Sequence, residues 1–393
     1  MSDPWLSIIG LNEDSLAGLS PASRAALDDA EIVFGGKRHL ELAEIGARGR
    51  AWPVPFALDP VLEHRGKRVA VLASGDPFWF GVGGSVSAVL ERGEYRVFPA
   101  PSTFSLAAAH LGWRLEEITC HGLHAAPLAQ LRGALAPRAR MICLLREGAA
   151  SRELAQWLTN HDAGAAKLWI MESLGGPKQR VRQTVAENFD LTDVTAPVAV
   201  AVALPENAGL SRASGLPDEL FAHDGQITKR PVRALTLSAL APRPGELLWD
   251  IGAGSGSISV EWCLAGGRAL AFETKLLRAA NIRRNARDFG LANRLTVIEG
   301  NALMRLDEQE LPDAVFVGGG GSDALFETLF KLLPEGTRLV ANGVTLETEA
   351  RLAALHARRG GELLRIELAQ AAPLGRMRGW QSARPVVQWS VVL

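Results

Sequence analysis

The segment 247-LLWDIGAGSGSISVEW-262 decides the fold of the second half of the chain. Apolar residues lead into Asp250, three glycines follow at alternating positions, and a second apolar run comes after them. This order predicts a buried strand, a tight glycine-rich turn and the first turns of a helix. Such a turn binds nucleotide-like ligands in many parallel α/β sheets, but the same pattern also fits a plain turn between strand and helix.

The spacing of the glycines discriminates between ligands. The dinucleotide fingerprint is G-x-G-x-x-G, whereas Gly252, Gly254 and Gly256 run G-x-G-x-G and Ser257 follows. Glycines let a ligand approach the backbone, and a helix N-terminus offers N–H groups to a carboxylate. Asp250 can orient a cationic amino group or hold the turn by hydrogen bonds. A zwitterionic amino-acid group therefore suits this turn better than a diphosphate.

Three later turns extend the expected site. The next strand ends in Glu273, where an acid can accept hydrogen bonds from two ribose hydroxyls. The third strand leads into 299-EGNAL-303, where Asn301 and Ala302 can border an adenine ring. The fourth ends in 317-VGGGG-321, a floor without side chains that a bulky substrate can approach. Four turns in register favour S-adenosylmethionine (SAM) as the cofactor.

Strand and helix patterns alternate along the whole chain, which is typical of α/β proteins. With 393 residues, the chain fits two or three domains. The alternation lapses around 205–226, so we expect domains at 1–205 and 223–393 joined by a linker at 206–222. The last two strand-like runs, 361–370 and 385–392, have no helix between them and predict an antiparallel pair at a sheet edge.

Composition restricts the class of protein. The 42 basic residues nearly cancel the 43 acidic ones, so no global field favours nucleic acid or an anionic membrane. We see no signal peptide and no apolar run long enough to span a membrane, and we expect a cytoplasmic protein. Cys120, Cys143 and Cys263 form no CxxC pair, so neither a disulfide framework nor a metal site is expected.

The second half resembles a known family. Residues 223-HDGQITKRPVRALTLSALAPRPGELLWDIGAGSGSISVEW-262 with 313-DAVFVGGGG-321 resemble the decarboxylating methyltransferases of cobalamin biosynthesis, which act on a precorrin. The resemblance implies a Rossmann-like (class I) SAM methyltransferase domain. Asn301 stands where family members often carry Asp, and a plain helix cap remains an alternative at Thr228. The cofactor-binding residues expected here are Thr228, Asp250, Gly252, Ala253, Gly254, Ser255, Gly256, Glu273, Asn301 and Ala302.

The first half resembles the tetrapyrrole (corrin/porphyrin) methylases, a two-lobed α/β family that binds SAM between its lobes. The resemblance rests on 71-VLASGDPFWFGVGGSVSAVL-90, 99-PAPSTFSLAAAHLGW-113 and 172-ESLGGPKQRV-181. The family's glycine-rich first loop is replaced by 8-IIGLNEDSL-16; we expect Asn12 to keep the loop conformation, because asparagine tolerates positive φ. The cofactor-binding residues expected here are Gly10, Gly75, Asp76, Pro77, Ser102 and Thr103.

The two domains in this order resemble the fused enzymes of this pathway. The resemblance implies methylation of precorrin-6Y at carbon 5 by the first domain and at carbon 15 by the second. It also implies decarboxylation of the ring C acetate, giving precorrin-8X, with two SAM sites per chain and a metal-free substrate. We further expect a homo-oligomer.

The substrate carries many carboxylates, which basic side chains receive best. Ordinary surface charge remains an alternative for each basic residue. His110 and His223 lie nearest the expected clefts, but neither they nor any known catalytic motif predict catalytic residues. The substrate-binding residues that we expect are Lys229, Arg233, Gly319, Gly320, Arg376 and Arg378.

Three other functions were weighed. An RNA methyltransferase needs a basic stripe with interleaved aromatics, which the balanced charge disfavours. A nicotinamide-dependent oxidoreductase is disfavoured by the glycine spacing. A non-catalytic scaffold that binds SAM remains open.

Overall fold

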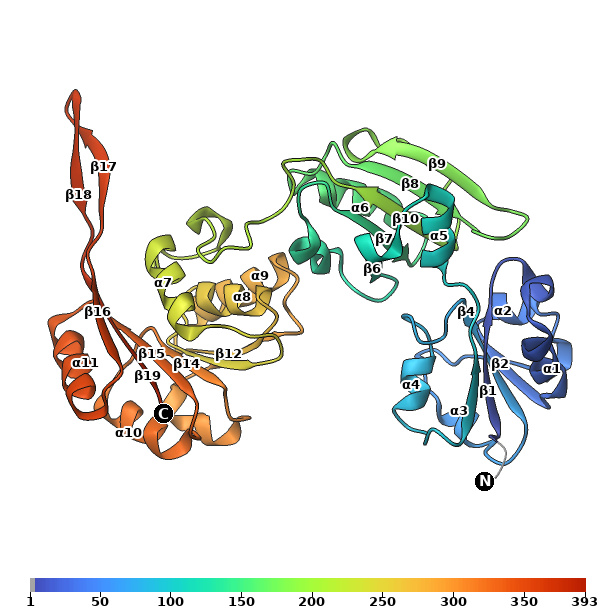
Figure 1. The fold of residues 1–393 in the computed structure, drawn as a ribbon, viewed down its shortest axis with the longest axis horizontal. Coiled ribbons are helices and arrows are strands. Elements are labelled where there is room, and N and C mark those ends of the chain that lie inside the picture. The colour runs from blue at the N-terminus through green and yellow to red at the C-terminus, as the bar shows by residue number, and fades with distance from the viewer. Residues whose placement is uncertain (1–3) are drawn as a thin grey trace. The chain divides into compact units, whose positions relative to one another are not determined.

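The computed structural model describes residues 4–393. Contacts within the chain divide it into two compact units, the first formed by residues up to Leu128 and by Ala134–Gly209. The second unit is formed by Leu210–Leu393 together with the short segment Ala129–Gly133. Figure 1 shows the helices and strands of both units.

The first unit begins with an entirely parallel five-stranded sheet in the order β3-β2-β4-β1-β5. The central strands β1 and β4 are almost continuously apolar because helices cover both faces of such a sheet. The strands are β1 (Leu6–Leu11), β2 (Ile32–Gly35), β3 (Gly49–Ala51), β4 (Val69–Ser74) and β5 (Tyr95–Phe98). The helices that accompany them are α1 (Pro21–Asp29), α2 (Lys37–Leu42), α3 (Asp59–Leu62) and α4 (Gly83–Ser87).

The second sheet of this unit has the order β6-β7-β10-β8-β9. Only β6 and β7 pair in parallel, and the other three pairs are antiparallel, which the alternating strand–helix pattern did not indicate. The strands are β6 (Thr119–Gly122), β7 (Arg140–Leu145), β8 (Lys167–Glu172), β9 (Arg180–Val185) and β10 (Val198–Ala203). Helices α5 (Thr103–Leu111) and α6 (Ala150–Thr159) belong to this lobe.

The second unit contains a seven-stranded sheet in the order β13-β12-β11-β14-β15-β19-β16. The first five are parallel, and β19 runs antiparallel to both β15 and β16. The predicted antiparallel pair at the sheet edge is therefore confirmed. The strands are β11 (Leu247–Ile251), β12 (Arg268–Glu273), β13 (Leu295–Glu299), β14 (Ala314–Val317), β15 (Arg338–Gly343), β16 (Glu362–Ile366) and β19 (Val386–Val392).

Helices cover both faces of this sheet, as expected for a Rossmann-like fold. Side chains from α7 (Arg230–Leu240), α8 (Ser257–Leu264) and α9 (Leu276–Asp288) share one apolar cluster with the sheet. Side chains from α10 (Asp323–Leu332) and α11 (Leu346–Arg359) share the other. The sheet is thus a buried middle layer whose loops at the carboxyl ends of the parallel strands carry the predicted site.

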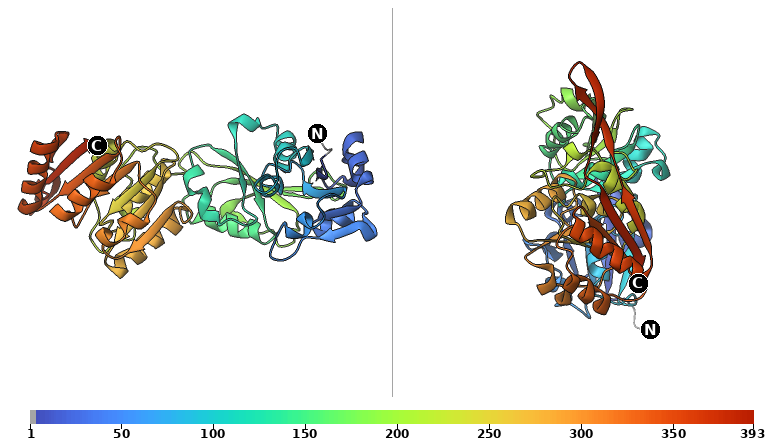
Figure 2. Two further views of the ribbon diagram at one scale, coloured as in Figure 1. Left: turned by 90° about the horizontal axis from the view of Figure 1, so that it is seen from below. Right: turned by 90° about the vertical axis from the view of Figure 1, so that its left-hand side faces the viewer.

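An unpredicted hairpin interrupts the edge pair. Strands β17 (Ala369–Leu374) and β18 (Met377–Ser382) pair only with each other and extend away from the seven-stranded sheet (Figures 1 and 2). The apolar residues Leu374, Met377 and Trp380 on this hairpin are largely exposed. Among residues 4–393, the helices are all too short or too polar to cross a membrane.

Candidate functional site

The glycine-rich turn of the second unit joins β11 to α8 in a conformation that requires glycine. Gly252, Gly254 and Gly256 have φ values of +69°, +60° and +71°, a region that other residues rarely adopt. A Cβ atom at Gly252 would lie 2.6 Å from the carbonyl oxygen of Gly319. The turns after β11 and β14 therefore touch backbone to backbone, and no side chain fills the space above them.

Glu273, the last residue of β12, fixes two of the turns. Its carboxylate accepts hydrogen bonds from the backbone N–H groups of Gly254 and Lys275, both at 2.9 Å. The side chain is nearly buried, at 5% exposure, yet it borders a cavity. Because each carboxylate oxygen can accept more than one hydrogen bond, Glu273 keeps capacity for a ligand hydroxyl.

Asp250 lies fully buried under the turn. Ser259 donates a hydrogen bond to its Oδ2 at 2.6 Å, while Oδ1 has no partner. Burial raises the pKa of Asp250 to about 6, and the nearby charge of Glu273 acts in the same direction. The hydroxyl of Ser255 is likewise buried without a partner. Two unsatisfied polar atoms in one turn are unusual and indicate a polar ligand group at this place.

Two neighbouring cavities open beside the turn and share Gly252, Arg278 and Gly319. The smaller, of about 190 Å³, is also lined by the predicted residues Glu273, Asn301, Ala302 and Gly320. The larger, of about 420 Å³, is also lined by the predicted residues Thr228, Lys229, Ala253 and Gly254. Asn301 is exposed, and its side chain accepts a hydrogen bond from the backbone N–H of Leu303.

The segment Asp224–Lys229 lies across the glycine-rich turn. Its first residue is held by Arg278, which donates to Asp224 at 2.8 Å. Its middle is close to the turn, because a Cβ atom at Gly254 would lie 3.4 Å from the carbonyl oxygen of Gln226. Near its end, the guanidinium of Arg233 donates to the carbonyl oxygen of Thr228. The segment is thus fixed at both ends over the larger cavity.

The prediction that Arg233 binds substrate is wrong. Its side chain is 0% exposed and forms ion pairs with Glu261 at 2.6 Å and Asp218 at 3.0 Å. It also donates to the carbonyl oxygen of Leu216, and Glu261 accepts from the backbone N–H groups of Gly215 and Leu216. Arg233 therefore supports the segment that covers the cavity, and it is buried away from both cavities, out of reach of a substrate carboxylate.

The other predicted substrate residues fall in different places. Lys229 borders the larger cavity and pairs with Asp218 at 3.5 Å. Arg376 and Arg378 belong to the β17–β18 hairpin and line neither of the two cavities. Arg384, which follows the hairpin, does line the larger one and is exposed.

The first unit brings three turns together at the carboxyl ends of its parallel sheet. A side chain at Gly10 would overlap the carbonyl oxygen of Gly75, which accepts a hydrogen bond from the backbone N–H of Ala100 at 3.1 Å. Gly75 has φ +52°, and a Cβ atom there would lie 2.9 Å from the carbonyl oxygen of Pro101. Ser102 caps α5 by accepting a hydrogen bond from the backbone N–H of Ser105.

The loop after β1 is held by a side-chain hydrogen bond of Asn12 and not, as was expected, by a positive φ at that residue. Asn12 has no positive φ; the residue of this loop that does is Ser15, at +62°. The side-chain amide of Asn12 donates to the carbonyl oxygen of Pro101 at 3.0 Å. The asparagine thus ties the first loop to the turn before α5.

Two cavities of about 410 and 160 Å³ adjoin these turns and share four lining residues, including Ser74 and Thr103. We call them the large and the small chamber of the first unit. The predicted residues Asp76, Ser102 and Thr103 line the large chamber, whereas Gly10, Gly75 and Pro77 contribute the close packing around it. The small chamber is lined by Asn12, Met171 and Ala199, among others.

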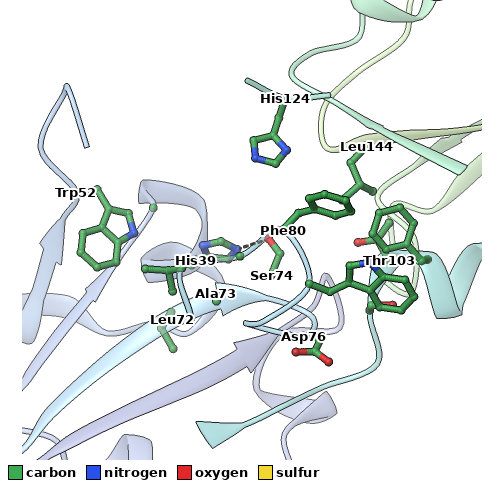
Figure 3. A pocket seen from close by; sticks show the side chains of 16 residues that line it. His39, Trp52, Leu72, Ala73, Ser74, Asp76, Phe80, Thr103, His124 and Leu144 are labelled. Carbon is green, nitrogen blue, oxygen red and sulfur yellow. Dashed lines mark hydrogen bonds between the residues drawn. The ribbon is translucent and has the colours of Figure 1, made fainter. Parts of the chain in front are cut away.

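The histidines of the large chamber escaped prediction. His39 and His124 line it, while His110 and His223 do not (Figure 3). Nε2 of His39 lies 2.8 Å from the hydroxyl of Ser74. Burial and the adjacent Arg38 cation lower the pKa of His39 to about 4. No spacing in the sequence links His39 with Ser74, because α2 and β4 bring them together from 35 positions apart.

The described residues fit SAM in the second unit on three grounds. The glycine turn excludes side chains, two buried polar atoms lack partners, and an acid ends the neighbouring strand. These are the features that an amino-acid group and a ribose require. Among residues 4–393, no group of three His, Cys, Asp or Glu side chains is placed to hold a metal ion.

Comparisons with known proteins cover both halves. The family of Tetrapyrrole (Corrin/Porphyrin) Methylases matches residues 6–190, and that of the Precorrin methyltransferase domain matches residues 219–393. A protein of Sinorhizobium sp named precorrin-6Y C(5,15)-methyltransferase [decarboxylating] is 48% identical over 98% of this chain and 96% of its own length. A protein of the same name from Mycobacterium tuberculosis (strain H37Rv) is 39% identical over 98% of each chain. The crystal structure of the C-terminal domain of precorrin-6Y C5,15-methyltransferase from Rhodobacter capsulatus is 59% identical, covers 47% of this chain and 100% of its own, and has a TM-score of 0.46.

Proposed function

Because this chain belongs to the precorrin-6Y C(5,15)-methyltransferase family, we propose that it methylates precorrin-6Y at carbons 5 and 15 with SAM. The reaction includes decarboxylation of the ring C acetate and gives precorrin-8X on the way to cobalamin. The first unit methylates carbon 5, and the second methylates carbon 15 and removes carbon dioxide. Two separate family matches, one to each half of the chain, support this division.

The observation that carries the proposal is the lining of the larger cavity in the second unit. Its charged side chains are the three cations Lys229, Arg278 and Arg384, and no carboxylate is among them. A ligand rich in carboxylates meets three cationic side chains there, of which Arg278 and Lys229 are also paired with Asp224 and Asp218. An open cavity with this lining, beside a turn that fits SAM, suits a polyanionic macrocycle better than a nucleic acid, for which the chain offers no excess of positive charge.

The residues that would hold SAM in the second unit follow from the geometry. Glu273, Asn301 and Ala302 border the smaller cavity, where the nucleoside would lie. Gly252 and Gly254 line the larger cavity and offer their backbone. Asp250 lines neither cavity and supplies a buried negative charge beneath the turn that would hold an amino group. When bound, SAM supplies an electrophilic methyl group on a sulfonium whose leaving thioether is neutral.

The task of the chain is to position the ring carbon and exclude water, since the leaving group is already good. The segment Asp224–Lys229, held by Arg278 and Arg233, covers the cavity on one side. The glycine floor of the larger cavity, at Gly318 and Gly319, admits a flat substrate without steric hindrance, whereas Gly320 lines only the smaller cavity. For decarboxylation, the conjugated macrocycle accepts the electron pair released from the acetate, so the protein has to orient that carboxylate.

We propose that both sites bind SAM, giving two per chain, and that the chain forms a homo-oligomer. The exposed apolar residues of the β17–β18 hairpin support the second point, because such groups are normally covered by a partner. Light scattering after gel filtration tests it: the mass of a single chain would contradict it.

The activity is tested by incubating the purified protein with precorrin-6Y and SAM that carries a ¹³C-labelled methyl group. Mass spectrometry should find a product with two labelled methyl groups that has lost one carbon dioxide. The variant Gly252→Ala should yield a product methylated once and not decarboxylated, and Gly75→Ala should lose the other methyl group. A product with both methyl groups from either variant would contradict the division of labour.

A further inference from the structure

His39 and Ser74, which line the large chamber of the first unit, form an ordered triad with Arg38, which lines the small chamber. Arg38 and His39 lie on α2, and Ser74 ends β4. The hydroxyl of Ser74 is 2.8 Å from Nε2 of His39 (Figure 3). One nitrogen of the Arg38 guanidinium lies 3.0 Å from the same Nε2 and 3.1 Å from the Ser74 hydroxyl. Arg38 in turn forms an ion pair with Glu13.

The direction of each hydrogen bond follows from the donors available. A guanidinium can only donate, so Nε2 of His39 accepts from Arg38 and carries no proton in the neutral ring. The Ser74 oxygen also accepts from Arg38, so its own O–H points to Nε2 and shares the single lone pair of that nitrogen with the Arg38 N–H. Burial and the Arg38 charge hold the pKa of His39 at about 4, so the ring is neutral near pH 7. The result is a serine hydroxyl backed by an imidazole that can accept its proton.

The position of the hydroxyl is suited to chemistry. Ser74 is exposed, although it sits at the end of a buried strand, and it lines both chambers of the first unit. Ser74 therefore lies at the junction of the two chambers, where a ligand in the small chamber would meet a ligand in the large one. Trp52, Trp79 and Phe80 also line the large chamber and offer flat apolar surface to a ring system.

We propose that Ser74, backed by His39, accepts the proton that leaves the ring carbon when the first unit methylates it. This inference rests on the proposed function, namely methylation at carbon 5 by this unit. Replacing a ring hydrogen by a methyl group releases one proton. The assignment of carbon 5 to the first unit does not identify the group that accepts this proton.

The step balances without any further reactant. An electron pair of the ring forms the new C–CH₃ bond as the S–CH₃ bond breaks, and the ring becomes cationic. The C–H bond at the same carbon then breaks, and its electron pair restores the ring double bond. The proton passes to Oγ of Ser74 while the proton of Ser74 passes to Nε2 of His39. The imidazolium, disfavoured beside Arg38, releases a proton to solvent.

The other titratable groups of the chamber are less well placed. Asp76 uses Oδ1 to accept from the backbone N–H of Phe78 at 2.9 Å, and this bond turns it toward its own loop. His124 is exposed, and within residues 4–393 no hydrogen bond orients its ring. Ser74 and His39 are the pair whose geometry is held by hydrogen bonds with Arg38, although Nδ1 of His39 is buried without a partner.

The test compares His39→Ala and Ser74→Ala with the control His110→Ala, which changes an exposed histidine of the same unit outside both chambers. Methylation at carbon 5 is followed in a single turnover with labelled SAM. Loss of the relay should slow it by about 100-fold or more, while the control keeps the rate of the unmodified protein. Binding of S-adenosylhomocysteine (SAH), measured by calorimetry, should be unchanged in all three.

Chemical rescue separates proton transfer from structural support. Added imidazole should restore part of the rate in His39→Ala, and imidazoles of graded basicity should restore it in graded amounts. A second readout needs no methyl transfer: with SAH bound in deuterated water, the unmodified protein should speed exchange of the hydrogen on carbon 5, and His39→Ala should not.

The outcomes are distinct. If the unmodified protein does not methylate carbon 5, the proposed function fails. If it does, and His39→Ala retains its full rate, the relay is refuted. A loss in His39→Ala that appears only as a raised KM and that imidazole does not rescue would also refute the relay, because the triad would then only anchor a substrate carboxylate.

Discussion

Replacing Asp250 by asparagine should stabilise the free second unit at neutral pH and weaken its binding of SAH. The side chain is 0% exposed, and its pKa is raised from 3.8 to about 6, chiefly by burial. An acid whose pKa is higher in the folded state destabilises that state once it ionises. Stability is therefore full below pH 3.8, falls as the pH rises through that value and levels off above about pH 6.

The magnitude follows from the same values. At about 1.4 kcal/mol per pKa unit, the ionised carboxylate costs the folded unit roughly 3 kcal/mol above pH 6. Roughly half of that cost, about 1.4 kcal/mol, develops between pH 5 and pH 8. Asparagine has no charge to bury, and its carbonyl oxygen can still accept from Ser259. The advantage of the variant should grow across this range by about 3–6 °C in Tm, at about 2–4 °C per kcal/mol.

Differential scanning calorimetry of the full chain measures this directly. Only the transition of the second unit should shift, and that of the first unit serves as an internal reference. Asp288→Asn, which removes a half-exposed acid on α9, is the matched control and should show no such pH dependence. If the difference in Tm between Asp250→Asn and the unmodified protein is constant from pH 5 to pH 8, ionisation of buried Asp250 does not destabilise the second unit. Unchanged SAH affinity would show that the unpaired Oδ1 serves no ligand.

Three further predictions follow from the packing of the two sites. Gly75→Ala should abolish SAH binding in the first unit but not in the second. The backbone at Gly75 has φ +52°, and a Cβ atom there would lie 2.9 Å from the Pro101 carbonyl oxygen. Calorimetry that still finds both sites would contradict this prediction. Arg233→Met should lower the free energy of unfolding of the second unit by about 3–5 kcal/mol, since it leaves Glu261 buried without its partner. An unchanged midpoint of urea unfolding would show that this ion pair does not support the unit. Arg384→Ala should raise the KM for the precorrin several-fold, and by less at high salt, while the affinity for SAH stays the same. A KM that the substitution leaves unchanged would show that Arg384 does not contact the substrate.

The parts of the fold that the sequence predicts are those with a local signal. Strands β4, β10 and β11 are apolar along nearly their whole length, and the structure buries them almost completely. The glycines of the turn after β11 are needed for positive φ, which the sequence pattern expresses directly. In these places, the property that makes the pattern visible is the one that shapes the backbone.

The parts that escaped prediction depend on partners distant in sequence. Strand β9 mixes charged and apolar residues and is only partly buried, so it has no clear period. The antiparallel pairing of the second sheet depends on which strands meet, and local composition does not encode this. Arg233 resembles a surface cation in the sequence, and only the fold reveals that it pairs with Glu261, 28 positions away.

The site shows the same limit. The glycines and Glu273 were found because their spacing follows the strands that carry them. His39 and Ser74 are joined only by the packing of α2 against β4. Nothing in the local sequence marked either residue.

The central claim is that one chain holds two working methyltransferase sites. Calorimetric titration of the purified protein with SAH tests this most directly, with NAD as the comparison ligand. We expect two sites per chain, one lost in Gly75→Ala and the other in Gly252→Ala, and no binding of NAD. A single site would contradict the claim of two working units, and uptake of NAD without SAH would contradict the proposed chemistry altogether.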